Sequence, residues 1–291
     1  MENIKINYSS LKKIADIADG ERISFSEAVI REQMKSLEVS EKVLIGKMEE
    51  RYQVMKKSIE DGLSKENHLK IEQNGGAKLY NTYVDTGKSL LGSIVGKVAS
   101  RAMAVSELNA SMGKICASPT AGSCGIMPAS IITIEEEYKI SHDKVIRSLF
   151  TSAGIGMVIA NVVGVAGATA GCQAECGTAT AMAAGTIVEM MGGTNEMILN
   201  AVDISIKNIE GLVCDPVAGL VECPCIKRNS SGAVSAVLSA DMALAGIKSI
   251  IPVDEVLLSM KQVGMKMSPE LRETSLAGLA TTETGKNIVL G

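Results

Sequence analysis

The chain has 291 residues, a formal net charge of −4, two Phe, five Tyr and no Trp. It lacks the clustered positive charge that binds phosphate backbones, so the composition argues against nucleic acid as a partner. Packing must rely on small and aliphatic side chains, which favours close-packed helices over an aromatic-rich sandwich, and we expect an all-α fold.

The N-terminal stretch MENIKINYSSLKK has neither the apolar core nor the small-residue cleavage site of an export signal. We therefore expect a cytoplasmic protein. In a reducing compartment the seven cysteines are poor disulfide candidates, and their odd number would leave one unpaired. Metal binding or catalysis is the better expectation for them.

Residues 1–74 are charged and periodic, whereas residues 75–291 are rich in small and apolar side chains. We interpret the first part as a charged helical region and the second as a helical domain. Ser24-Phe-Ser-Glu27 has the form of a capping box, and Ser40 is placed to cap a helix over residues 41–62. That helix should bury one stripe, made of Val43, Leu44, Met48, Tyr52 and Met55.

In the second part, helical segments are separated by SPTAGSCG, GCQAECG, MGGTN and CDPVAGLVECPC. Residues 148–174 carry no charge and are long enough to cross a bilayer. They are rich in Gly, Ala, Ser and Thr, however, and no aromatic belt or asymmetry of positive charge flanks them. We expect buried helices there and no membrane partner.

Three cysteines stand out: Cys172 in AGCQAECGTATAMAAG, Cys214 in GLVCDPVAG and Cys225 in ECPCIKRN, 42 and 11 residues apart. Three thiolates at helix ends can bind an iron–sulfur cluster and leave one iron open to a substrate. On spacing alone, inert core cysteines are an equal alternative. Zinc is a weaker one, because structural zinc prefers paired C-x₂₋₄-C knuckles.

The motifs around these cysteines are NASMGKICASPTAGSCGIMPA, AGCQAECGTATAMAAG and GLVCDPVAGLVECPCIKRN. Over residues 75–288 the chain resembles the alpha subunit or alpha domain of iron–sulfur L-serine dehydratases. The resemblance implies a lyase that converts L-serine to pyruvate and ammonia, and a catalytic domain carrying a [4Fe–4S] cluster on Cys172, Cys214 and Cys225. Cys176 and Cys223 are not ligands in the family pattern, and we expect them to have packing roles.

The hydroxyl-rich turn SPTAGS could offer a carboxylate both hydroxyl and backbone N–H donors, particularly if it opens a helix. From the residues alone, a plain helix-start turn is the alternative, but the resemblance implicates the turn in substrate binding. The basic segment after the last of the three cysteines is a further candidate, because a guanidinium suits a planar carboxylate, although an exposed charge pair is equally compatible. The predicted substrate-binding residues are Ser118, Thr120, Gly122, Ser123, Arg228 and Asn229.

The catalytic base is not apparent. The two histidines, His68 and His142, lie outside the family motifs, and we interpret both as solvated or helix-capping. In the family, a separate beta subunit or domain carries histidine motifs, so we expect a hetero-oligomer whose beta subunit supplies the base. The sequence ends TGKNIVLG, without the cysteine tail of some single-chain relatives. We therefore expect water or a partner residue at the fourth iron.

Two other functions fit the same cysteines. One is a cluster-dependent lyase acting on L-cysteine or another 3-substituted amino acid, because an open iron could also draw off a thiol. The other is an iron–sulfur sensor without enzymatic activity. A pyridoxal-dependent dehydratase is disfavoured, because no segment resembles the Schiff-base lysine and phosphate cup that this cofactor needs.

Overall fold

The computed structural model describes residues 6–288 and confirms an all-α fold. Within this range one isolated bridge, between Cys214 and Arg272, is the sole β-type pairing. The first five residues of the N-terminal stretch and the last three of TGKNIVLG lie outside the description. The α-helices of residues 6–288 are α1 (Leu11–Glu21), α2 (Phe25–Ser36), α3 (Glu41–Ser64), α4 (Gly76–Asp85), α5 (Gly92–Ala110), α6 (Ile126–Tyr138), α7 (His142–Val162), α8 (Gly167–Ala170), α9 (Thr178–Met190), α10 (Asn195–Lys207), α11 (Cys225–Leu244), α12 (Val253–Lys266) and α13 (Glu283–Asn287).

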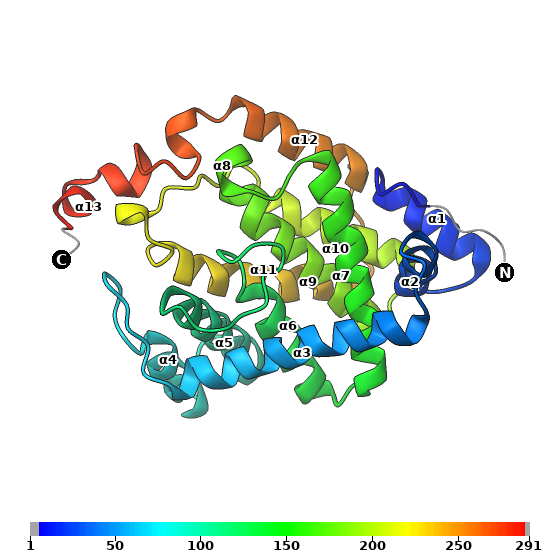
Figure 1. Cartoon of the computed structure of the whole chain (residues 1–291), viewed down its shortest axis with the longest axis horizontal. Helices are drawn as coiled ribbons and strands as arrows, with labels where there is room; N and C mark the ends of the chain where they lie inside the picture. Colours follow the sequence, from blue (N-terminus) through cyan, green and yellow to red (C-terminus); the bar gives the residue numbers. More distant parts are fainter. Residues whose placement is uncertain (1–5, 289–291) are drawn as a thin grey trace.

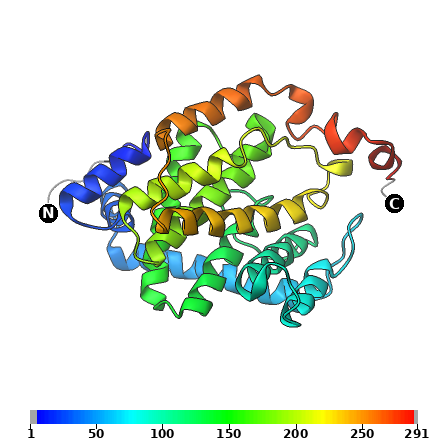
Figure 2. The ribbon, with the colours of Figure 1, turned by 180° about the vertical axis from the view of Figure 1, so that it is seen from behind.

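Helix α9 is the centre of the fold. Residues 178–188 of this helix are all buried. A helix that is apolar on every side is stable only when other elements surround it. Helices α6, α7, α10 and α11 pack around α9, and α3 and α12 lie on opposite outer sides of the molecule (Figures 1 and 2).

The predicted helix starts near the N-terminus are confirmed. The Ser24 hydroxyl accepts the Glu27 N–H at 3.1 Å, so the N-cap half of the predicted capping box is present, while the Glu27 carboxylate pairs with Arg31. Helix α3 begins at Glu41, as expected, and ends at Ser64, two residues later than predicted. Ser40 occupies the N-cap position, although its side chain makes no capping hydrogen bond.

The apolar stripe of α3 is correct except at one position. Leu44, Tyr52 and Met55 are buried, and Met48 is half-buried against the core. Val43 is 42% exposed, so its assignment to the stripe is wrong. Successive residues of a helix point about 100° apart. Val43 therefore points to one side of the face that Leu44 and Tyr52 bury, and its side chain stays exposed.

The boundary expected after residue 74 falls in the loop that precedes α4. Helices from both sides of this loop contribute to one continuous buried cluster, in which Phe25 and Tyr52 meet residues of the second part. The contacts of α2 with α7, and of α3 with α5 and α6, make this connection. Packing therefore joins the two regions through an extended apolar interface.

The uncharged stretch 148–174 comprises the last two thirds of α7, the short helix α8 and the residues that follow it. Among residues 6–288, α7 is the one helix that is long and apolar enough to span a membrane. In its most apolar window, 61% of the residues are buried inside the protein. A core helix of a globular domain can have the length and composition of α7. The buried helices that we expected in residues 148–174 are therefore present.

The motif GCQAECG is not the break that we expected. A π-helix over Gln173–Gly177 continues directly into α9. The change of direction occurs earlier, at Gly171, whose φ of 76° is one that glycine adopts without strain. The Gln173 side chain anchors the π-helix, because its amide donates to the Met260 carbonyl at 3.0 Å and accepts the Gly211 N–H at 2.8 Å.

Two glycines of α3 should respond oppositely to the same change. A Cβ at Gly62 would lie 2.2 Å from the Ala104 carbonyl oxygen, whereas one at Gly46 would meet no atom within 4 Å. Gly62→Ala should lower the free energy of unfolding by roughly 1–3 kcal/mol, because α3 and α5 must separate. Gly46→Ala should raise it by about 0.5–1 kcal/mol. Urea unfolding of both variants tests this, and equal effects would contradict the described helix contact.

A junction of α3, α6 and α7 is expected to depend on pH. The His142 ring nitrogens lie 2.7 Å from a Glu49 oxygen and 3.5 Å from a Glu135 oxygen. Burial alone would lower the pKa of His142, but the hydrogen bonds and charges of these two carboxylates outweigh it and raise the pKa above its usual value.

The protonated ring should therefore stabilise the fold fully below about pH 6.5, and this contribution should be lost as the pH rises through the raised pKa. His142→Gln should lower the unfolding temperature at acidic pH and lose its effect at alkaline pH. His68→Gln, in an exposed loop, is the control. Thermal unfolding across pH measures both, and a pH-independent effect of His142→Gln would refute the assignment.

Candidate active site

The three predicted cluster ligands come from three separate segments. Cys172 immediately precedes the π-helix, Cys214 lies in the loop after α10, and Cys225 is the first residue of α11. Cys172 and Cys214 are 2% and 4% exposed, and Cys225 is partly buried. Negative charge on Cys172 or Cys225 would act on the Cys214 thiol, so the fold brings the three sulfurs into one electrostatic environment.

The three thiols differ in acidity. A hydrogen bond between Cys172 and Cys176, whose Sγ atoms lie 3.3 Å apart, together with the charge of Arg228, lowers the pKa of Cys172. Burial, followed by the charge of Cys172, raises the pKa of Cys225 to about 12 and that of Cys214 above its usual range. Iron binding must therefore displace protons from at least two of the thiols.

The three predicted ligands supply the kind of donor that an iron–sulfur cluster uses, the thiolate. Within residues 6–288, no three His, Cys, Asp or Glu side chains are grouped as the ligands of one metal ion. A four-iron cluster makes a different demand, since it is held by thiolates on different irons. A Cβ at Gly167 would lie only 3.0 Å from the Cys214 sulfur, so the missing side chain leaves space beside this thiol.

The C-terminal segment runs beside the Cys214 loop. The Cys214 N–H donates to the Leu271 carbonyl at 2.8 Å, and the Cys214 carbonyl accepts the Glu273 N–H at 2.7 Å. Glu273 has a φ of 63°, which is costly for a residue other than glycine. Its carboxylate and the Cys214 sulfur both lie within 3.2 Å of a Cβ built on Gly167, so this strained residue adds negative charge at the edge of the site.

The SPTAGS turn directly precedes α6, as its proposed role requires. Ser118 is buried, and Ser123 is fully buried with its hydroxyl 3.1 Å from the Thr120 hydroxyl. Thr120 and Gly122 remain partly exposed. The more accessible part of the turn is therefore Thr120–Gly122, and the two serines lie behind it.

Asn229 connects the turn to the cysteines. Its amide nitrogen donates to the Gly122 carbonyl at 2.7 Å and to the Cys225 carbonyl at 2.9 Å, and its oxygen accepts the Gly125 N–H at 2.9 Å. The side chain is fully buried. These three bonds use both ends of the amide, so Asn229 is suited to hold the turn in place.

Arg228 braces the Cys214 loop. Its guanidinium lies 2.9 Å from an Asp215 oxygen and donates to the Val213 carbonyl at 2.9 Å. Burial alone would lower the pKa of Arg228, but the negative charges of Cys172 and Asp215 outweigh it and raise the pKa. Arg228 therefore places a fixed positive charge beside the thiols.

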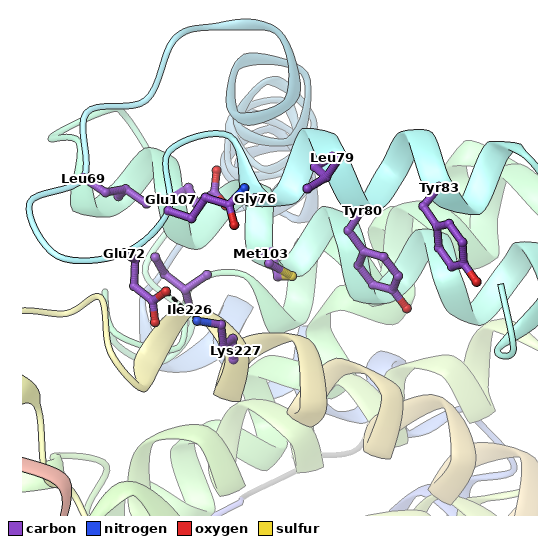
Figure 3. Close-up of a pocket in the computed structure, with 11 residues that line it drawn as sticks. Leu69, Glu72, Gly76, Leu79, Tyr80, Tyr83, Met103, Glu107, Ile226 and Lys227 are labelled. Atoms are coloured by element: carbon purple, nitrogen blue, oxygen red, sulfur yellow. Dashed lines mark hydrogen bonds and ion pairs between the residues drawn. The ribbon is translucent and has the colours of Figure 1, made fainter. Parts of the chain in front are cut away.

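The neighbouring Lys227 points elsewhere. It pairs with Glu72 on the wall of a pocket of about 430 Å³, which Tyr80 and Tyr83 of α4 also line (Figure 3). The residues lining this pocket include none of the three predicted cluster ligands. The adjacent residues Lys227 and Arg228 thus form ion pairs with different parts of the molecule, Glu72 and Asp215.

Sequence reasoning missed two carboxylates. Glu175 accepts the Thr120 hydroxyl and the Gly122 N–H, and burial raises its pKa. The sequence does contain a signal for a special role of Glu175, because it is the only charged residue between Ser148 and Val188. Glu222 is buried and accepts the N–H groups of residues 70–72 at 2.9–3.1 Å, which ties that loop to the cysteine-bearing segment.

Neither histidine takes part in these contacts. His142 binds Glu49 and Glu135 at the junction of α3, α6 and α7. The His68 backbone N–H donates to the Ser111 hydroxyl at 2.9 Å, and its side chain is exposed. The described part of the site therefore combines thiols, hydroxyls, carboxylates and one guanidinium.

Comparison with known proteins identifies the family. The model of the family described as "Serine dehydratase alpha chain" matches residues 20–280. The chain is 42% identical over 281 residues to "Probable L-serine dehydratase, alpha chain" of Bacillus subtilis (strain 168), covering 97% of this chain and 94% of the relative.

Another relative, "L-serine dehydratase, alpha chain" of Peptoniphilus asaccharolyticus, is 43% identical over 281 residues, or 96% of each protein. "L-serine dehydratase" of Helicobacter pylori (strain ATCC 700392 / 26695) is 32% identical over 291 residues, which are 97% of this chain but 63% of that longer protein. The chain belongs to the serine dehydratase alpha chain family.

Proposed function

We propose that the chain is the alpha subunit of an L-serine dehydratase and that Cys172, Cys214 and Cys225 hold a [4Fe–4S] cluster. The observation that supports the proposal is the link between the SPTAGS turn and the last of these cysteines, because the Asn229 amide donates to the backbone carbonyls of both Gly122 and Cys225. Membership of the family supports the reaction, in which L-serine yields pyruvate and ammonia.

Dehydration of serine requires removal of the α proton and departure of a poor leaving group. When bound, a cluster with an open iron supplies a Lewis acid for the substrate hydroxyl. The chain's own residues orient the substrate. The partly exposed Thr120–Gly122 segment, which precedes α6, offers backbone N–H donors to the carboxylate. Arg228 adds positive charge nearby, and the enamine that is released becomes pyruvate and ammonia in water.

We also propose that a beta subunit completes the active site of a cytoplasmic hetero-oligomer. Two relatives of matching length carry the name "alpha chain", whereas the Helicobacter pylori relative is longer. The contacts of the two histidines also lie away from the cysteines, which supports a base supplied by another chain or domain.

Anaerobic iron and sulfide analysis tests the ligand assignment. Cys172→Ala, Cys214→Ala and Cys225→Ala should each lose most of the bound iron and sulfide, because each removes one thiolate of the cluster. Cys223→Ala is the matched control, since Cys223 is half-buried and lies two residues from Cys225 in the same segment. Normal iron content in any of the three ligand variants would contradict the assignment.

Substrate addition separates the proposed function from its alternatives. L-serine should change the absorption spectrum of the wild-type cluster, and pyruvate should form when the beta subunit is present. Faster pyruvate formation from L-cysteine would favour the related lyase. A cluster that does not respond to amino acids would favour a sensor, and full serine turnover by the isolated chain would remove the need for a partner.

A further inference from the structure

Glu175 is a carboxylate without an evident structural reason to be where it is. It lies in the π-helix Gln173–Gly177, between Cys172 and Cys176, and is partly buried. π-helical turns are rare and occur often at functional sites. Arg228, the cation that acts on Cys172, pairs with Asp215 and makes no ion pair with Glu175 among the described residues.

The surroundings of Glu175 are electrostatically unfavourable. Burial raises the pKa of Glu175, and the charge of Glu273 acts in the same direction. Placing a partly buried carboxylate near a second carboxylate costs folding free energy, because like charges repel at short range in a poorly solvated environment. Proteins usually keep such an unfavourable charge arrangement only where function requires it.

The compensating interactions of Glu175 come from the turn. The Thr120 hydroxyl and the Gly122 N–H both donate to its carboxylate. A Cβ at Gly122 would lie 2.6 Å from one carboxylate oxygen and 3.0 Å from the other, so the carboxylate occupies the space beside that glycine. Glu175 thus contacts the most accessible part of the turn, and it belongs to the segment that starts at Cys172.

We propose that Glu175 is a positioning residue that sets the Thr120–Gly122 segment relative to Cys172. It would hold the backbone N–H donors for the substrate carboxylate at the distance from the cluster that lets one serine molecule reach both. Asn229 also fixes the turn, through the Gly122 and Cys225 carbonyls. The inference rests on the proposed function, and it assigns Glu175 a role in substrate affinity.

The test uses the anaerobically reconstituted alpha chain together with its beta subunit, and follows the serine-dependent spectral change. In Glu175→Gln, iron and sulfide content should equal the wild type, while the serine concentration at half-change should rise about tenfold to a hundredfold, the value of one hydrogen bond to a charged group. KM should rise in parallel, with a smaller change in kcat. Glu270→Gln, at an exposed acidic residue, is the control.

Two further variants reach the same contact without altering Glu175. Gly122→Ala should displace the carboxylate and weaken serine binding in the same direction, and adding Glu175→Gln to it should produce little further loss, because both changes act through one contact. Thr120→Val should also weaken binding, and Thr120→Ser, which keeps the hydroxyl, should restore most of the affinity. Thermal unfolding shows whether each variant is folded.

Three results would overturn the positioning role. They are an unchanged serine midpoint in Glu175→Gln, a loss of kcat alone with unchanged KM, which would indicate a catalytic base, and a loss of iron, which would indicate support of the cluster. A wild-type enzyme without a cluster or a serine response would overturn the proposed function itself, and the positioning role with it. The wild-type measurement therefore distinguishes the two failures.

Discussion

The site depends on a buried amide that joins segments distant in sequence. Asn229 donates to the Gly122 and Cys225 carbonyls and accepts the Gly125 N–H. A buried amide with an unmet partner would cost about 1–3 kcal/mol, so this side chain, the turn and the start of α11 are stable only in register with one another. The cysteine at the start of α11 and the turn before α6 are consequently placed as one unit.

The apolar core makes that register possible. Helix α9 is buried on all sides, and the π-helix that carries Glu175 runs directly into it. Small residues let the neighbouring helices approach closely, as at Gly125, where a Cβ would lie 2.2 Å from the Ala102 carbonyl oxygen. The Cys172 segment is therefore anchored in the densely packed interior of the molecule.

Charge is the opposing constraint. Cys172, Cys225 and Asp215 act on one guanidinium, that of Arg228. Glu175 and Glu273 add further negative charge that acts on Cys214. Burial keeps two of the thiols protonated in the metal-free chain. Iron would relieve this excess of acidic groups, because positive metal charge stabilises thiolates. The electrostatics of the bare site and the proposed cluster are thus consistent with each other.

The sequence by itself determined the all-α fold, the capped start of α2 and the family, because helix periodicity, capping residues and long motifs are local patterns. It also indicated the cysteines and the turn. Only the tertiary structure decided that Glu175 meets Thr120, 55 residues away, and that Asn229 holds the turn. It likewise showed that Val43 lies outside the buried stripe of α3 and that Gln173–Gly177, within the GCQAECG motif, form a π-helix. Contacts between distant segments depend on how helices pack, and no local pattern encodes them.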